Sequence, residues 1–277
     1  HQPTAHWHIS EAGEERDTFH ALTQVIPIEP YTFFQEIEEK LQPKPDHDYY
    51  HLWHQLEQEA GSGISNLITD QNTVFSEIRV LKALFAILPN EAVLHLGNSL
   101  PVRHVQFLAP LIEESGCLIK ANRGTSGIDG CLSAAVGYAQ QTQRPVYAIL
   151  GDLAFMYDRN ALWFNSLPAN LFIIVLNNSG GGVFRTLPGA KDQPELEDYF
   201  ASAQYTHFQY TAQQHGCPYR YANDWQKLSA CLSLLQKPSN APMLLELGFE
   251  QKDNFQDQSA IHADLMAKLS PLLETGN

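Results

Sequence analysis

Short apolar runs alternate with segments of helical spacing along most of the chain. The runs at 146–150 (VYAIL) and 171–176 (LFIIVL) are apolar at every position, which is typical of strands covered by helices on both faces. This alternation predicts an α/β fold, a doubly wound and mostly parallel sheet flanked by helices. The expected strands are 93–96, 117–120, 146–150, 171–176, 218–222 and 243–249, and the expected helices are about 101–114, 127–141, 157–166, 208–215, 224–236 and 259–273.

The first 84 residues follow a different pattern. Residues 1–45 carry scattered prolines and two strand-like pieces, about 6–9 and 23–27, in an otherwise irregular segment. We interpret them as the remnant of a domain that begins earlier in a longer protein, because the chain starts at His1 without an initiator methionine. The divisions expected are a remnant at 1–45, a linker and helical connection at 46–84, and a main domain at 85–277.

Within the connection, a polar helix is expected at about 47–60, ended by the glycine-containing sequence GSGIS. His47, His51 and His54 could share part of its face and bind a metal. The surrounding sequence DHDYYHLWHQLEQE favours an ordinary polar helix instead, and no helix carries an HExxH arrangement.

Charge and cysteine content narrow the classes of function. The chain has 17 basic and 31 acidic residues, a net charge of −14, which disfavours binding to nucleic acid or to anionic lipid. Even the apolar run at 171–176 is far shorter than the roughly 18 residues that a bilayer crossing needs. The cysteines stand apart without CxxC spacing and are expected to be reduced thiols in the cytoplasm: Cys117, Cys131, Cys217 and Cys231.

The most unusual residues follow the two most apolar strands. Gly151 and Asp152 come directly after the run at 146–150, and Asn177 and Asn178 follow the run at 171–176, ahead of three glycines. Because ligands bind at the carboxyl ends of parallel strands, we expect the two side chains, Asp152 and Asn178, on neighbouring strand ends. A carboxylate, an amide oxygen and a glycine carbonyl would suit an octahedral Mg²⁺ that also binds phosphate and water.

An anion could also be held there without a lysine. Gly151 lets a phosphate approach the main chain closely. The helix expected at about 157–166 would begin just beyond and direct its positive amino terminus at the same place.

Taken together, the GD and NN pairs resemble the thiamine diphosphate motif, with Leu153 in place of the usual third glycine. The sequence is similar to the MenD family, the thiamine-diphosphate-dependent 2-succinyl-5-enolpyruvyl-6-hydroxy-3-cyclohexene-1-carboxylate synthases, over about 85–249. The matching segments are HLGNSLPVRH (95–104), ANRGTSGIDG (121–130), GDLAFMYDRNAL (151–162) and LNNSGGGVFRTLP (176–188).

This resemblance implies a role for individual residues. Mg²⁺, or Mn²⁺ in its place, would be bound by Asp152, Asn178 and the Gly180 carbonyl. The diphosphate and the rest of the cofactor would contact Gly151, Leu153, Ala154 and Gly181.

The substrates and the catalytic centre would use a second set of residues. Ile128 would lie under the cofactor and hold its two rings in a bent shape, while Phe184 and Leu187 would shelter the reacting carbon from water. The carboxylates of donor and acceptor would face Asn98, Ser99, Arg103 and Arg123, since a guanidinium group binds a carboxylate through two parallel hydrogen bonds.

The resemblance also implies the overall reaction. The family decarboxylates 2-oxoglutarate and adds the product carbanion to isochorismate in menaquinone biosynthesis. Its members are homo-oligomers, expected here as a dimer or tetramer, whose active site is completed by a glutamate of a pyrimidine-binding domain. Nothing in this chain resembles that domain, so the chain alone is expected to be inactive.

Three other interpretations remain for comparison. One is another thiamine-dependent enzyme, such as an acetolactate-synthase-like carboligase or a 2-oxoacid decarboxylase, which should lack the GNS…R and NRG…GIDG segments. Another is a cofactor-binding module without catalysis of its own. A dinucleotide-binding domain is disfavoured, because the glycines at 180–182 follow a late strand and no GxGxxG opens the first turn.

Overall fold

The computed structural model of the protein describes residues 4–41, 48–68, 74–112, 116–237 and 240–275. The chain forms two compact units, His1–His51 and Leu52–Asn277. Among the described residues, no helix combines the length and the apolar composition that crossing a membrane requires.

The first unit contains a small parallel pair of strands, β1 (Trp7–Ile9) and β2 (Gln24–Ile26), followed by helix α1 (Pro30–Lys40). The two strands were expected, but the irregular structure predicted after them was wrong. Pro30 opens α1 in its first turn, where a missing N–H removes no helical hydrogen bond. The Glu29 carboxylate caps the helix by accepting from the Thr32 N–H at 2.9 Å.

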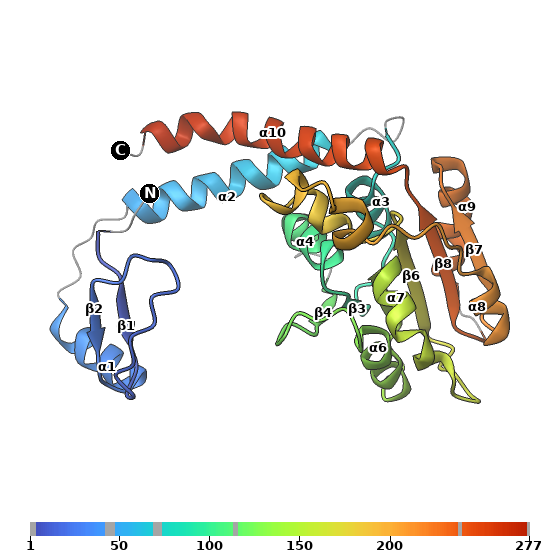
Figure 1. Ribbon diagram of the computed structural model, residues 1–277, viewed down its shortest axis with the longest axis horizontal. Helices are drawn as coiled ribbons and strands as arrows, with labels where there is room; N and C mark the ends of the chain where they lie inside the picture. The colour runs from blue at the N-terminus through green and yellow to red at the C-terminus, as the bar shows by residue number, and fades with distance from the viewer. Residues whose placement is uncertain (1–3, 42–47, 69–73, 113–115, 238–239, 276–277) are drawn as a thin grey trace. The chain divides into compact units, whose positions relative to one another are not determined.

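Helix α2 (Asp48–Leu67) continues through the GSGIS sequence that was predicted to end it. Tertiary packing explains the difference, because a side chain at Gly63 would come within 2.9 Å of Leu265 on α10 (Gln251–Thr275). The later part of α2 therefore lies close against α10 (Figure 1), and Ile64 is buried there. His51 and His54 lie on α2, whereas His47 falls outside the described residues.

The second unit is built on a six-stranded sheet in which every neighbouring pair is parallel, as predicted (Figure 1). The strand order reverses at β3, which has β4 on one side and β5 on the other, so a topological switch point lies between β3 and β5. In spatial order the strands are β4 (Leu118–Ala121), β3 (Val93–Leu96), β5 (Val146–Gly151), β6 (Leu171–Asn177), β8 (Met243–Gly248) and β7 (Tyr219–Ala222).

Helices bury both faces of this sheet, and alternate strand residues point to opposite sides. Tyr147 and Ile149 pack with one cluster of buried residues, and Ala148 and Leu150 with the other. The first cluster takes side chains from the later part of α2 and from α3 (Glu77–Phe85), α4 (Leu100–Phe107), α9 (Trp225–Leu235) and α10. The second takes them from α6 (Cys131–Gln140), α7 (Asp152–Asp158), the 3-10 helix η2 (Arg159–Leu162) and α8 (Gln209–Gln214).

The remaining elements are short. They are α5 (Ala109–Ile112), the 3-10 helices η3 (Gly182–Arg185) and η4 (Ala190–Asp192), and the π-helical turn η5 (Leu196–Phe200). The cysteines form no disulfide within the described residues.

Helix boundaries differ from the prediction in several places. Helix α6 begins at Cys131 instead of 127, and α10 begins at Gln251 instead of 259. The helix expected at 101–114 is divided at Leu108 into α4 and α5, and Pro110, the second residue of α5, has no N–H with which to continue the helical ladder of α4. The helix expected at 157–166 instead begins at Asp152, directly after Gly151, and is followed by η2. Asp152 thus belongs to the first turn of α7, where a negative charge favours the helix.

Candidate functional site

One cavity of about 460 Å³ lies at the carboxyl ends of β3, β5 and β6, beside the switch point. Every site residue that the sequence predicted lines it, although the residues come from four separate segments of the chain. They are Asn98, Ser99, Arg103, Arg123, Ile128, Gly151, Asp152, Leu153, Ala154, Asn178, Gly180, Gly181, Phe184 and Leu187.

Asp152 is buried at the end of β5, and its side chain reaches across to the glycine loop after β6. One carboxylate oxygen accepts from the Leu153 N–H at 2.7 Å and the other from the Gly180 N–H at 2.7 Å. The pKa of Asp152 is raised to about 7, mainly by burial and in smaller part by the nearby charge of Glu77, while these two hydrogen bonds act to lower it. A cation bound here would lower the pKa of Asp152 and so counteract the effect of burial.

Asn178 is buried on the neighbouring strand end and carries an unsatisfied acceptor. Its Nδ2 donates to Glu77 Oε1 at 2.7 Å. Its Oδ1 is also buried but has no hydrogen-bond partner among the described residues. Leaving a buried acceptor unpaired costs about 1–3 kcal/mol, so this oxygen has the character of a ligand atom.

The glycine loop brings its main chain close to both side chains. Gly180 has a φ of +127°, and a Cβ there would lie 2.5 Å from the Ala201 carbonyl oxygen. A Cβ at Gly182 would lie 2.8 Å from Asn178 Nδ2. These positions therefore require glycine. The Gly180 carbonyl accepts from the Gly182 N–H at 2.9 Å, which leaves its second lone pair for a cation.

These oxygen donors fit a hard divalent cation. A buried carboxylate lies at one strand end, an amide oxygen without a partner among the described residues lies at the adjacent strand end, and a glycine carbonyl belongs to the loop that follows. Within the part of the chain that the structure describes, no group of three or more histidine, cysteine, aspartate or glutamate residues is placed to hold a metal.

Two arginines lie at the same cavity. Arg103, on α4, donates from Nη1 to the Ser99 carbonyl oxygen at 2.8 Å. Arg123 donates from Nη1 to Asn98 Oδ1 at 2.9 Å. The Asn98 amide nitrogen also donates to the carbonyls of Asn122 and Gly127, at 2.8 and 2.5 Å, so this buried side chain holds Arg123 and the loop after β4 in place.

The other side of the cavity is apolar. Ala154 is buried and Ile128 and Leu153 are half-buried, while Leu187 is 39% exposed. Phe184 packs against Phe200 of η5, with ring centroids 6.0 Å apart. The cavity thus joins a polar, negatively charged end to an apolar wall, with arginines available for an anionic ligand.

Strained backbone at the site was missed by sequence reasoning. Ser99 and Ser126, which line the cavity, have φ of +75° and +58°, and Ser179, next to Asn178, has φ of +61°. Such conformations cost about 1–3 kcal/mol for a residue with a side chain and often mark functional sites. Serine in a polar loop gives no sequence signal of positive φ.

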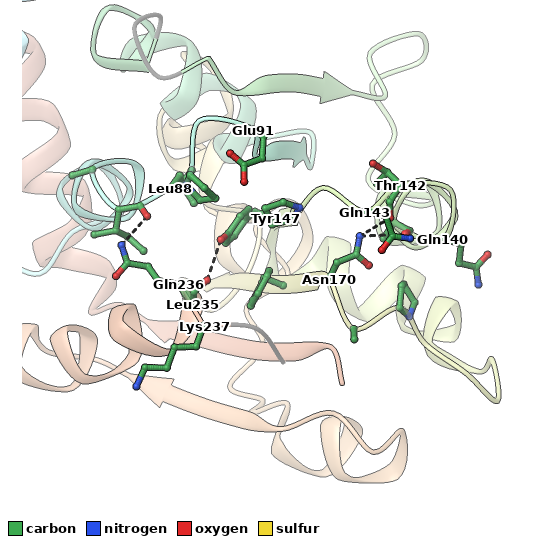
Figure 2. A pocket seen from close by; sticks show the side chains of 18 of the residues that line it. Leu88, Glu91, Gln140, Thr142, Gln143, Tyr147, Asn170, Leu235, Gln236 and Lys237 are labelled. Atoms are coloured by element: carbon green, nitrogen blue, oxygen red, sulfur yellow. Dashed lines mark hydrogen bonds between the residues drawn. The ribbon is translucent and has the colours of Figure 1, made fainter. Parts of the chain in front are cut away.

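A larger hollow of about 1010 Å³ opens at the opposite, amino-terminal edge of the sheet (Figure 2). The polar side chains there tie loops together. Asn170 Nδ2 donates to the carbonyls of Ala139, Thr142 and Arg144 at 3.3, 3.0 and 2.8 Å. The Tyr147 hydroxyl donates to the Leu235 carbonyl at 3.0 Å (Figure 2). These contacts are structural, and the smaller cavity remains the candidate site.

Known proteins resemble this chain in sequence and in fold. No protein-family model matches it. It is 35% identical over 250 residues to 2-succinyl-5-enolpyruvyl-6-hydroxy-3-cyclohexene-1-carboxylate synthase of Phocaeicola vulgatus, covering 89% of this chain and 42% of the relative. The synthase of the same name from Desulfotalea psychrophila is 37% identical over 219 residues, 79% of this chain and 38% of the relative.

The fold is also found in a solved structure, that of benzoylformate decarboxylase from Polynucleobacter necessarius. The TM-score is 0.54 at 15% sequence identity, with 66% of this chain and 34% of that chain covered. At this identity the likeness concerns the fold alone.

The chain spans less than half of the length of the synthases it matches. The similarity to the Phocaeicola vulgatus synthase nevertheless covers 89% of this chain. Over nearly nine-tenths of its own length, the chain is a homologue of part of the 2-succinyl-5-enolpyruvyl-6-hydroxy-3-cyclohexene-1-carboxylate synthases.

Proposed function

We propose that this chain supplies the cation- and diphosphate-binding part of a thiamine-diphosphate-dependent carboligase. The reaction proposed is that of the homologous synthases, in which decarboxylation of 2-oxoglutarate is followed by addition to isochorismate. One observation carries the proposal: Asn178 Oδ1 is buried and has no hydrogen-bond partner among the described residues, and it lies next to the buried Asp152 carboxylate at the carboxyl ends of adjacent strands.

The cation is Mg²⁺, or Mn²⁺ in its place, and its ligands are the Asp152 carboxylate, Asn178 Oδ1 and the Gly180 carbonyl. The diphosphate lies beside Gly151, where a Cβ would meet no atom of the described residues within 4 Å, so the main chain is open to a ligand. Leu153, Ala154 and Gly181 contact the cofactor, and Ile128 supports its rings. Bound in this way, the cofactor supplies the stabilisation of the carbanion, and the chain supplies position and charge.

The substrates are anions, and the chain offers two guanidinium groups to bind them. Arg103 and Arg123 bind the carboxylates of donor and acceptor, with Ser99 beside them and Asn98 holding Arg123. Phe184 and Leu187 form the wall that excludes water from the reacting carbon. Both the charge and the shape of the cavity thus suit a dicarboxylate better than a neutral ligand.

The complete active site requires a further domain. We propose that a pyrimidine-binding domain supplies the missing catalytic carboxylate within a cytoplasmic homo-oligomer, and that residues 1–45 come from a middle domain before the diphosphate-binding domain at 85–277. By itself the chain binds cofactor but does not turn over substrate.

A calorimetric titration tests the cofactor site. The chain is titrated with thiamine diphosphate in the presence and absence of Mg²⁺, beside the Asp152→Ala variant. We expect binding that depends on Mg²⁺ and is lost in the variant. Binding that is equally tight without Mg²⁺, or unchanged by the substitution, would contradict the proposal.

A product assay then separates the carboligases. The chain is mixed with the amino-terminal part of a homologous synthase, and 2-oxoglutarate with isochorismate is compared with pyruvate alone. Consumption of the first pair supports the proposed reaction. Preference for pyruvate would favour an acetolactate-synthase-like enzyme, and cofactor binding without turnover in the mixture would favour a non-catalytic module.

A further inference from the structure

A second buried carboxylate, Glu77, lies directly behind the proposed cation ligands. It is the first residue of α3, its side chain is 1% exposed, and it lines the same cavity as Asp152 and Asn178. It comes from a segment far upstream of both strand ends. Burying a carboxylate is costly unless its oxygens are well paired, so its partners indicate what holds it there.

Both Glu77 oxygens are occupied by buried side chains. Oε1 accepts from Asn178 Nδ2 at 2.7 Å and from Asn254 Nδ2 at 3.0 Å. Oε2 pairs with His104 Nε2 at 2.7 Å. The Glu77 N–H in turn donates to Asn254 Oδ1 at 2.8 Å. Glu77 is therefore held from α4 and α10 while it contacts the end of β6.

The contact with Asn178 has a direct consequence for that residue's orientation. An ionised carboxylate only accepts hydrogen bonds, so the amide nitrogen of Asn178 must face Glu77. The amide oxygen must then point away from Glu77, and this is the buried atom for which the described part of the chain offers no hydrogen-bond partner. A 180° flip of the amide would place two oxygens against each other and turn an N–H donor toward the cation.

We propose that Glu77 is a positioning residue of the cation site, which orients Asn178 Oδ1 toward the cation and adds its own negative charge behind it. This inference rests on the proposed function of the cavity. The negative charge of Glu77 acts at the site, since Glu77 is among the groups that raise the pKa of Asp152. Residues that orient metal ligands in this way typically contribute 10- to 100-fold to metal affinity.

The contact between α3 and α10 also offers a matched control, a carboxylate whose partners are residues other than the proposed cation ligands. Asp257 on α10 accepts from the Ser76 hydroxyl at 2.6 Å and pairs with Arg79 on α3 at 2.8 Å. Like Glu77, it is a buried carboxylate that joins α3 to another element. Its loss should weaken packing at this junction without altering the orientation of Asn178.

The test measures Mn²⁺ binding by electron paramagnetic resonance at saturating thiamine diphosphate, using the full 277-residue chain. We expect Glu77→Ala to weaken Mn²⁺ binding about 10- to 100-fold. Glu77→Gln should fall between this variant and the wild type, because its amide oxygen can still accept from Asn178 while the charge is gone. Asp257→Asn should bind Mn²⁺ like the wild type while unfolding at a lower urea concentration.

Each outcome decides a different point. Equal Mn²⁺ affinity in Glu77→Ala and wild type would overturn the inference, and so would an equal loss in Asp257→Asn, which would indicate a general effect of packing. If Glu77→Ala does not fold, Glu77→Gln decides alone, and an unchanged dissociation constant overturns the inference. A wild-type chain that binds no Mn²⁺, or an Asn178→Ala variant that binds it fully, would refute the cation site itself.

Discussion

Replacing Asp152 by asparagine should make the unliganded chain more stable at alkaline pH while removing its cation binding. Burial raises the pKa of this carboxyl from 3.8 to about 7. The Asp152 carboxyl ionises near pH 3.8 in the unfolded chain and near pH 7 in the folded chain. The protonated group therefore contributes its full stabilisation below pH 3.8, and this stabilisation is lost as the pH rises through 7. A difference of about three pKa units corresponds to about 4 kcal/mol above pH 7.

Asparagine recovers only part of this free energy. Both carboxylate oxygens accept backbone N–H groups, from Leu153 and Gly180, and the amide nitrogen of asparagine cannot accept the second. The lost hydrogen bond costs about 1–3 kcal/mol. We therefore expect Asp152→Asn to be more stable than the wild type by about 1–3 kcal/mol at pH 8. At pH 5 the gain should nearly vanish. This pH lies only about one unit above the unfolded pKa of 3.8, so the wild type has lost only about 1.6 kcal/mol, and the missing hydrogen bond of asparagine offsets that amount.

Urea unfolding at pH 5 and pH 8, with and without Mg²⁺ and thiamine diphosphate, measures both effects. The ligands should stabilise the wild type and leave Asp152→Asn unchanged. The control is Asp158→Asn in the same helix, where the carboxylate accepts from the N–H and hydroxyl of Ser133 at 2.7 and 2.6 Å; it should lose stability. If Asp152→Asn is destabilised at pH 8 as much as Asp158→Asn, the reasoning from burial is wrong.

Three further predictions concern the loop, the core and the arginine support. Gly180→Ala should destabilise the chain by at least about 2 kcal/mol, because it meets both a positive φ and the Ala201 carbonyl; a urea midpoint like that of the wild type would contradict this. Burial raises the pKa of the Cys217 thiol from 9.0 to about 11, so stability should fall between these pH values, and less so in Cys217→Ala. Asn98→Ala should weaken 2-oxoglutarate binding in the complemented enzyme, measured as a raised KM, because Arg123 loses the partner that holds it.

Much of the fold and of the candidate site could be predicted from the sequence. The strands β5 and β6 are apolar at nearly every position, and their local pattern alone predicted two-sided burial. Once those strands were placed, the residues that follow them had to lie at one edge of a parallel sheet. The proximity of Asp152 and Asn178 was therefore predictable from neighbouring strand ends.

Contacts between distant segments could not be predicted in this way. Glu77 begins a helix whose apolar spacing is ordinary, and an acidic residue in a first turn is common for reasons of the helix dipole alone. Its contact with Asn178 joins residues 101 positions apart. The continuation of α2 through Gly63 has the same origin, since close packing on Leu265 offsets the low helix propensity of glycine.

The sequence by itself determined which strands are buried and which oxygen-bearing side chains follow them, because the local pattern of apolar residues sets both the burial of a strand and the position of its end. Only the tertiary structure decided how those side chains are oriented. Orientation depends on a hydrogen-bond partner brought from elsewhere in the chain, as Glu77 is brought to the amide of Asn178. Asn178 Oδ1 is thereby left buried at the cavity, with no partner in the part of the chain that the structure describes.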